Sequence, residues 1–196
     1  MRDFLNLGIR LLLICAISAG LLGATYSVTK EPIAQHAEQA SIEANKAVCP
    51  SADSFKELNL SGFQSKPGWD ASFADITDAL QAQKGGKTVG YVVKVNGSGY
   101  GGTIAMTVGL DLAGEYTGVS IDSMNESPGL GTKAKDDAFK GQYTGKSSAQ
   151  ELAVTKNDTA NDNEIKAITG ATITSKAVTS AINVAGRFAQ AFLVGQ

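Results

Sequence analysis

Residues 88–95 read Thr88-Val89-Gly90-Tyr91-Val92-Val93-Lys94-Val95, and residues 103–110 read Thr103-Ile104-Ala105-Met106-Thr107-Val108-Gly109-Leu110. In both stretches an apolar side chain recurs at every second position, which is the period of a β-strand with one buried face. The connection between them, residues 96–102, contains four glycines, and glycine allows the backbone to reverse sharply. We therefore predict two antiparallel strands. Their buried faces carry Val89, Tyr91, Val93 and Val95 in the first strand, and Ile104, Met106, Val108 and Leu110 in the second.

Further elements extend this pair toward the C-terminus. Asp111–Glu115 predicts a turn and Tyr116–Met124 a third strand, so that the chain forms an antiparallel meander. Shorter patterns then indicate a helix at Lys133–Phe139, a strand at Glu151–Thr155 and a polar loop at Thr155–Asn163.

A long helix is predicted at Thr174–Leu193. Apolar residues recur along it at spacings of four and three, which is typical of an amphipathic helix that packs on a sheet. The predicted fold class is therefore α+β, an antiparallel sheet packed with helices. The apolar stripe consists of Val178, Ile182, Ala185, Ala189 and Phe192.

The N-terminal segment has no charged residue from Leu11 to Thr29. At ~1.5 Å per residue it approaches the ~30 Å of a bilayer core, so we predict a transmembrane helix within residues 1–30. Arg2 and Arg10 precede this run. The positive-inside rule therefore places the N-terminus in the cytoplasm and the folded part on the outer face of the cytoplasmic membrane. A cleavable signal peptide, cut near residues 22–24, is the alternative.

The segment between the span and the strands divides into two parts. Glu31–Val48 predicts a helical stalk, with Pro32 in its first turn and Cys49-Pro50 after its end. We assign residues 31–50 to this stalk and 51–196 to one folded domain. The pattern of residues 51–83 favours neither helix nor strand, although Ser61-Gly62 and Lys66-Pro67-Gly68 indicate loops. Its candidates for the core are Phe55, Leu58, Leu60, Phe63 and Trp69.

Composition excludes several classes of function. The 196 residues include 17 basic and 19 acidic side chains, and beyond residue 30 the balance is 14 to 18, a net charge of −4. No basic stripe offsets this charge, so nucleic acid binding is not expected. Two isolated cysteines, Cys15 and Cys49, and the single histidine, His36, exclude a disulfide framework, a zinc site and Ser-His-Asp catalysis. Redox chemistry would therefore come from a bound cofactor without metal ligands from the protein.

Two short motifs point to such a cofactor. Thr169-Gly170-Ala171-Thr172-Ile173-Thr174 stands at the start of the C-terminal helix, where unpaired N–H groups and the positive end of the helix dipole favour a phosphate. Glu126–Lys133 forms a tight, glycine-containing loop that a flat ring can approach closely. Together they predict a phosphorylated cofactor. Taken alone, the threonine motif is also typical of a helix N-cap.

Three stretches, in this order, resemble the FMN-binding domain family: Gly99-Tyr100-Gly101-Gly102, then Glu126-Ser127-Pro128-Gly129-Leu130-Gly131, then Thr169-Gly170-Ala171-Thr172. The resemblance covers roughly residues 88–193. In that family the second threonine of the last motif carries FMN through a phosphoester bond. The resemblance therefore implies covalent FMN on Thr172. A threonine hydroxyl has no lowered pKa, so an external flavin transferase that uses FAD as donor would have to form the bond.

The same resemblance implies roles for neighbouring residues. Thr174 and Ser175 would donate hydrogen bonds to the phosphate, and Glu126 would hold its loop through backbone N–H groups. Tyr100 would stack on the flavin ring, or else pack as a partly buried side chain. Lys133 would lie near the ring edge, or else be a plain surface lysine. The other expected cofactor contacts are Thr169, Gly170, Ala171, Ser127, Gly129, Leu130 and Gly131, and no catalytic residue or metal ligand is expected.

Two positions depart from the family's motifs. Family members usually carry an aspartate three residues before the first Ser/Thr of the attachment motif, where this chain has Lys166. Asp162 or Glu164 are the alternative acids. Ser127 replaces a threonine and keeps the hydroxyl.

The length and the single N-terminal span resemble the G subunits of Rnf electron-transport complexes. This resemblance implies an electron-transfer subunit of a ferredoxin:NAD⁺ oxidoreductase coupled to Na⁺ or H⁺ translocation, without independent catalytic activity. Its partners would be other membrane and peripheral subunits. The alternatives are a C-subunit-like component of a sodium-translocating NADH:quinone reductase, a stand-alone membrane-anchored flavin carrier or sensor, and a pilin-like surface protein.

Overall fold

The computed structural model describes residues 2–157 and 161–195. The chain divides into two compact units, Met1–Ser41 and Ile42–Gln196. Helix α1, Arg2–Val48, makes up the described part of the first unit and continues into the second. Its stretch Asn6–Val48 is long and apolar enough to cross a membrane, with a mean hydropathy of 2.1 over its most apolar window. The large apolar side chains described between residues 7 and 33 of this helix are exposed, as expected for side chains that face lipid.

Helix α1 passes through Pro32 without interruption. Placing Pro32 in the first turn of a stalk helix is therefore wrong. Because proline has no N–H group, the carbonyl of Val28 lacks its usual helical donor there. The predicted end is confirmed, since α1 ends at Val48, directly before Cys49-Pro50.

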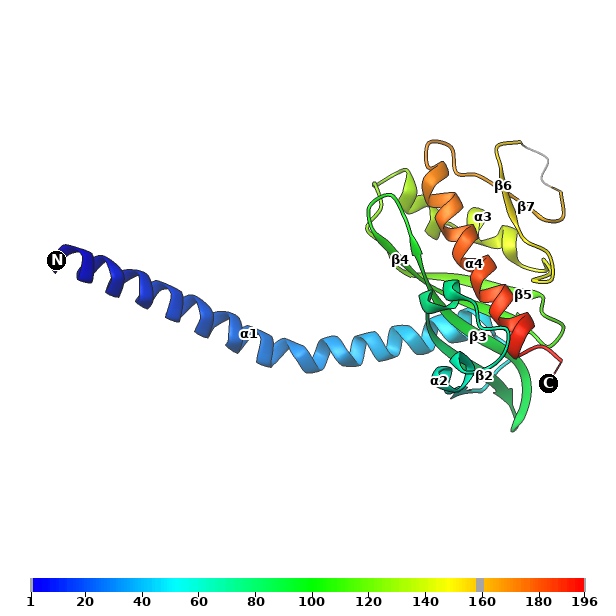
Figure 1. Ribbon diagram of the computed structural model, residues 1–196, viewed down its shortest axis with the longest axis horizontal. Helices are drawn as coiled ribbons and strands as arrows, with labels where there is room; N and C mark the ends of the chain where they lie inside the picture. The colour runs from blue at the N-terminus through cyan, green and yellow to red at the C-terminus, as the bar shows by residue number, and fades with distance from the viewer. Residues whose placement is uncertain (1, 158–160, 196) are drawn as a thin grey trace. The chain divides into compact units, whose positions relative to one another are not determined.

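The second unit is built on a five-stranded antiparallel sheet (Figure 1). Its strands, in spatial order, are β1 (Ser54–Glu57), β2 (Ile76–Lys84), β3 (Lys87–Ser98), β4 (Thr103–Asp111) and β5 (Tyr116–Ser123). The predicted meander is confirmed as β3, β4 and β5. The strands β1 and β2 come from the stretch whose pattern favoured neither helix nor strand, and they extend the meander by two.

Helix α4, Thr172–Phe192, packs on one face of the sheet, across β3 and β4 (Figure 1). All five residues of the predicted apolar stripe are buried in the main core. The predicted inner face of β4 is also confirmed, because Ile104, Met106, Val108 and Leu110 are fully buried in the same core. The fold is thus α+β, as predicted.

Val89 departs from the predicted inner face of β3. In the β2–β3 ladder Ala82 pairs with Gly90 and Gln83 pairs with Thr88, so Val89 is the extra residue of a β-bulge. Its side chain packs instead against a second, smaller apolar cluster. That cluster consists of Val48, Cys49, Leu80, Ala82 and Val92.

The last turn of α1 belongs to the second unit and is docked on the sheet. Val48 is 1% exposed, and its carbonyl oxygen accepts a hydrogen bond of 2.5 Å from Thr117 Oγ1 on β5. Gly109 on β4 and Gly118 on β5 lie directly against the Val48 backbone; a Cβ atom at Gly118 would be 3.2 Å from Val48 Cα. Both glycines therefore allow a close approach that a side chain would obstruct.

Short elements complete the second unit. The expected loop at Ser61-Gly62 is wrong, because these residues lie in helix α2, which Asn59 caps by accepting a 3.1 Å hydrogen bond from Ser61 N. The predicted helix at Lys133–Phe139 is interrupted at Asp136. Residues 158–160 of the predicted polar loop lie outside the described residues. The short elements are α2 (Leu60–Gln64), η1 (Ala71–Asp75), η2 (Gly131–Lys135), α3 (Asp137–Lys140), η3 (Gly141–Tyr143), and the parallel pair β6 (Ala153–Thr155) and β7 (Glu164–Lys166).

The core candidates of residues 51–83 are buried only in part. Phe63 and Trp69 pack edge-on or tilted against Phe188 and Phe192 of α4, with ring centroids 5.4 to 6.4 Å apart. These contacts cover one end of the α4–sheet interface, away from the helix start.

Candidate cofactor-binding site

The threonine motif forms the start of α4. The helix begins at Thr172, two residues before the predicted position, and its N-cap residue is Ala171. No side chain makes a capping hydrogen bond there, so the interpretation of the motif as a threonine N-cap is wrong. The N–H groups of Thr172, Ile173 and Thr174 come before the first helical hydrogen bond and are orphan donors by helix geometry. Gly170, with φ of 79°, supplies the left-handed turn into the helix.

The hydroxyl groups at this helix start have different surroundings. Thr174 Oγ1 donates to Glu126 Oε2 at 2.6 Å, and Ser175 Oγ donates to Ala171 O at 2.9 Å. Both side chains are buried, so their hydroxyls are used within the protein rather than offered to a phosphate as expected. Thr172 is half-buried, and among the described residues its hydroxyl has no hydrogen-bond partner.

A hollow of about 460 Å³ lies beside Thr172. This volume is within the ~300–1,000 Å³ that small-molecule sites usually have. The hollow unites residues from all three motifs of the sequence, which are far apart along the chain. Its lining consists of Tyr100, Glu126, Ser127, Leu130, Gly131, Gly170, Ala171, Thr172, Ile173 and Thr174.

The hollow has an apolar rim. Tyr100, Leu130 and Ile173 are 71%, 46% and 57% exposed, and they come from three different segments. Large apolar side chains that converge in this way on one hollow offer a surface for a flat, apolar ring. Tyr100 is therefore not the partly buried packing residue that was one of its two expected roles.

Glu126 is the one carboxylate among the residues that line the hollow, and it is 7% exposed. Glu126 Oε1 accepts a hydrogen bond from Gly101 N at 2.9 Å, in the loop that carries Tyr100. The backbone N–H group that donates to Glu126 therefore belongs to the Tyr100 loop, and not to the Glu126–Lys133 loop that this side chain was expected to hold. Its other oxygen accepts the hydroxyl of Thr174, so the side chain touches two of the three segments that form the hollow.

Two family models match this chain. Residues 99–186 match the FMN-binding domain, and residues 2–48 match the RnfG N-terminal region. The chain is 39% identical over 171 residues to the G subunit of a proton-translocating ferredoxin:NAD⁺ oxidoreductase complex from Clostridium ljungdahlii, with 87% of this chain and 83% of the relative covered. The chain belongs to the family of Rnf G subunits. A second member, the G subunit of a Na⁺-translocating complex from Acetobacterium woodii, is 38% identical over 184 residues, with 91% of this chain and 88% of the relative covered.

Two solved structures with the same fold are named as NqrC or as the C subunit of a different complex. The C subunit of the Na⁺-translocating NADH-quinone reductase from Parabacteroides distasonis superposes with a TM-score of 0.58 at 21% identity, covering 81% of this chain and 84% of that one. NqrC from Shewanella oneidensis superposes with a TM-score of 0.51 at 22% identity, covering 59% of this chain and 58% of that one. At such identities the likeness concerns the fold alone.

The hollow of this Rnf protein fits FMN by its own chemistry. Orphan N–H donors at the start of α4 suit a phosphate, and the adjacent rim suits a ring. A Cβ atom at Gly170 would lie 3.1 Å from Leu130 Cδ2, so glycine at this position avoids a tight contact between the threonine motif and the Glu126–Lys133 loop. The FMN-binding domain thus places unpaired helix N–H groups and an apolar rim next to a threonine hydroxyl that has no partner among the described residues.

Four of the predicted cofactor residues do not line the hollow: Thr169, Gly129, Lys133 and Ser175. Gly129, with φ of 74°, shapes the loop, and its N–H donates to Thr132 Oγ1 at 2.9 Å. Lys133 instead lines a separate hollow of about 180 Å³ together with Lys166 on β7. The position where the family usually has aspartate therefore faces a different surface from the one around Thr172.

Ile173 is a lining residue that the sequence did not single out. Its flanking threonines drew attention to hydroxyl chemistry, and an isoleucine at a helix start is usually assigned to the core. One signal was available: Ile173 does not fall on the apolar stripe that begins at Val178. An apolar residue off the stripe of an amphipathic helix is exposed unless something covers it.

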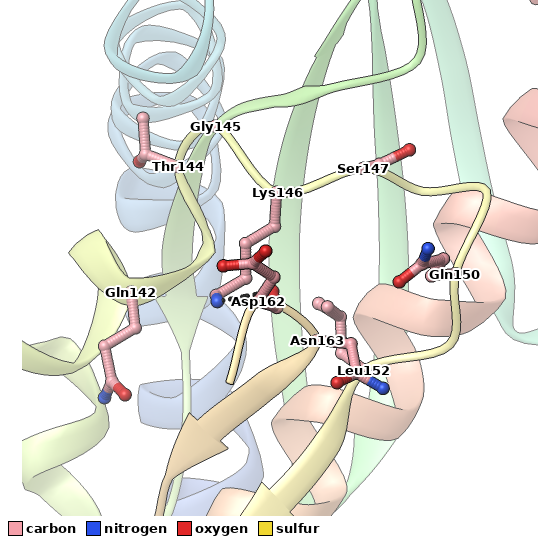
Figure 2. A pocket seen from close by; sticks show the side chains of 9 residues that line it. All are labelled: Gln142, Thr144, Gly145, Lys146, Ser147, Gln150, Leu152, Asp162 and Asn163. Atoms are coloured by element: carbon pink, nitrogen blue, oxygen red, sulfur yellow. Dashed lines mark hydrogen bonds between the residues drawn. The ribbon is translucent and has the colours of Figure 1, made fainter. Parts of the chain in front are cut away.

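A second hollow, of about 400 Å³, lies elsewhere in the same unit and is polar (Figure 2). Lys146 crosses it, and its Nζ donates to the backbone carbonyl of Asp162 at 2.7 Å. Asp162 thus lines a different hollow from Thr172, and Glu164 accepts hydrogen bonds from Asn161 at 3.0 and 3.1 Å. No residue of the three motifs lines this hollow, and Leu152 is the one large apolar residue in its lining, so it offers no apolar rim.

Proposed function

We propose that this protein is the electron-transfer subunit of a membrane-bound ferredoxin:NAD⁺ oxidoreductase and carries FMN through a phosphoester bond to Thr172. The observation that supports this most directly is the hollow that joins all three FMN-binding motifs around one threonine hydroxyl without a partner among the described residues. Bound FMN would supply reversible electron transfer. The domain would bind it, orient it and limit its contact with water.

Different residues of the hollow would bind the phosphate and the ring of FMN. The N–H groups of Thr172, Ile173 and Thr174 and the positive end of the α4 dipole would stabilise the phosphate charge. Tyr100, Leu130 and Ile173 would contact the flavin ring, and Gly170 would avoid crowding Leu130 beside it.

Attachment would need an external flavin transferase. Glu126 lines the hollow, but both of its oxygens already accept hydrogen bonds, and it does not contact the Thr172 hydroxyl. Among the described residues, no base in contact with Thr172 therefore activates its oxygen, and a threonine hydroxyl is a weak nucleophile at its ordinary pKa. A transferase with FAD as donor would supply the activation.

The experiment is expression of the full chain with the flavin transferase, followed by fluorescence of the denatured protein and intact mass. We expect the wild type to gain the mass of FMN less one water and to stay fluorescent after denaturation. Thr172→Ala should lose both. Thr169→Ala, a threonine of the same motif that does not line the hollow, should keep the added mass. Retention in Thr172→Ala, or loss in Thr169→Ala alone, would contradict the assignment.

The surrounding complex follows from the family. Its members include subunits of a proton-translocating and of a Na⁺-translocating complex at almost the same identity to this chain. Overall identity therefore does not select the ion. We propose other membrane and peripheral subunits as partners. An N-terminal anchor by α1, with the N-terminus in the cytoplasm and the FMN-binding domain on the outer face, completes the proposal.

A further inference from the structure

We infer that Glu126 is a positioning residue: its carboxylate ties the Tyr100 loop to the first turn of α4 and thereby sets two walls of the hollow before any cofactor arrives. The inference rests on the proposed function for the identity of the ligand. The tie itself is a contact of the apoprotein.

The carboxylate of Glu126 is buried, and each of its oxygens has a hydrogen-bond donor. At 7% exposure an ionised carboxylate is costly unless hydrogen bonds replace its water. Each oxygen has one donor: Gly101 N at 2.9 Å, 25 residues away in the chain, and Thr174 Oγ1 at 2.6 Å, 48 residues away. Hydrogen bonds to an ionised group are stronger and shorter than neutral ones. One side chain therefore links three segments that the sequence separates widely.

Three glycines make room for this link. A Cβ atom at Gly131 would lie 2.5 Å from Glu126 Oε2 and 2.9 Å from Thr174 Oγ1. A Cβ atom at Gly99 would collide with Glu126 Oε1, and one at Gly101 would collide with the carbonyl oxygen of Asn125. These glycines belong to the motifs with which FMN binding was predicted. Gly99 and Gly131 leave room for the carboxylate itself, and Gly101 lets the Tyr100 loop approach the backbone at Asn125.

The two donors are next to the residues that the hollow needs. Gly101 follows Tyr100, and Thr174 is two residues after Thr172 in the first turn of α4. Holding Gly101 and Thr174 on one carboxylate therefore fixes the exposed Tyr100 ring relative to the attachment oxygen. Without the tie, the loop would lose this side-chain link to the helix start, and the ring wall would be mobile.

The variant Glu126→Gln tests whether the hydrogen-bond geometry of this side chain or its charge positions the loop. The amide oxygen of Glu126→Gln can still accept from Gly101 N, and its NH₂ group can donate to Thr174 Oγ1. Glu126→Ala removes both bonds. Thr174→Val keeps the side-chain shape and removes one of them. The matched control is Asp111→Ala, because Asp111 is also a carboxylate with two donors. Its Oδ1 accepts from Ala113 N at 2.9 Å and from Glu115 N at 2.8 Å, in the turn between β4 and β5.

The test has two readouts on the full chain. The first is hydrogen exchange of the Gly101 amide in the apoprotein, which needs no flavin. The second is the rate of covalent flavin attachment, with the fluorescence anisotropy of the attached flavin. We expect Glu126→Ala to speed exchange at Gly101 and slow attachment by about tenfold or more, because it removes both charge-assisted hydrogen bonds. Thr174→Val should show a smaller loss of both. Glu126→Gln keeps two neutral hydrogen bonds and should lose much less than Glu126→Ala, while Asp111→Ala should match the wild type.

The outcomes are distinguishable. If Glu126→Ala and Thr174→Val keep Gly101 protected and load flavin at the wild-type rate, the tie does not position the site. If Glu126→Gln is as deficient as Glu126→Ala, the charge matters rather than the geometry, and the inference is overturned. If the wild type binds no flavin but exchange at Gly101 follows the predicted order, the proposed function has failed while the tie has not.

Discussion

Tyr143 is the residue through which alkaline pH should act on stability. Its side chain is fully buried, and its hydroxyl shares a 2.8 Å hydrogen bond with Thr179 Oγ1. Burial raises the pKa of Tyr143 above its ordinary value of 10.0, and burial does the same for Tyr116, whose hydroxyl donates to Ile182 O at 3.2 Å. The folded state keeps both protons while the unfolded state releases them near pH 10. Their contribution is therefore fully present below about pH 10 and is lost as the pH rises toward the folded pKa values.

Tyr143→Phe tests this linkage. Above about pH 10 the free energy of unfolding should decrease with pH less steeply in the variant than in the wild type. The difference in slope should be about 1.4 kcal/mol per pH unit, because one of the two linked protons is gone. At neutral pH the loss should be about 1 kcal/mol, since Thr179 keeps its hydrogen bond to Ser175 O. Urea unfolding of the full chain in detergent from pH 7 to pH 11 measures both. Tyr100→Phe, at a position 71% exposed, is the control, and an unchanged slope in Tyr143→Phe would contradict the linkage.

The site residues show where sequence reasoning succeeds. Thr172, Leu130, Gly131 and Gly170 were predicted from short motifs, and the structure brings them into one hollow. The roles of Thr174 and Ser175 were wrong because the helix begins two residues earlier than its periodicity indicated. Thr174 and Ser175 lie inside the helix, four and three residues before Val178, so they continue its buried stripe and their hydroxyls bond within the protein.

The contact between the last turn of α1 and the sheet is where we expect an element to be most sensitive to one added atom. A Cβ atom at Gly109 would collide with the Val48 carbonyl oxygen and lie 2.5 Å from Thr117 Oγ1. Gly109→Ala should therefore reduce the free energy of unfolding by about 2–3 kcal/mol, because backbone must move to admit the methyl group. Chemical denaturation measures the change.

Gly141→Ala is the control for that substitution. Gly141 has nothing within 4 Å of an added Cβ atom and a φ of −62°, which alanine adopts without strain. It should be neutral or stabilising by up to about 1 kcal/mol, through a smaller entropy of the unfolded chain. Equal effects of the two substitutions would mean that the end of α1 is not docked on β4.

The elements that the sequence missed have local physical reasons. β1 has one half-buried residue among exposed ones, and β2 carries an irregularity at each end, so neither shows a clean period of two. Val89 was assigned to the wrong face because a bulge shifts the pattern by one residue, and a bulge depends on the partner strand. By contrast, β4 and α4 have unbroken periods against one core, and both were predicted with the correct buried face.

At the scale of the whole molecule, the proposed orientation can be tested with single cysteines. With Cys15→Ala as background, Cys49 stays silent in the folded protein because it is 1% exposed. A cysteine at Lys87, exposed in the β2–β3 hairpin, should react with a membrane-impermeant maleimide in spheroplasts. A cysteine at Asn6 should react only after permeabilisation, because Arg2 and Arg10 keep that end in the cytoplasm. The reverse pattern would contradict the orientation. A shorter mature chain without Asn6 would instead show that residues 22–24 are a signal-peptide cleavage site, and the FMN-binding domain would then depend on its partners rather than on α1 to stay at the membrane.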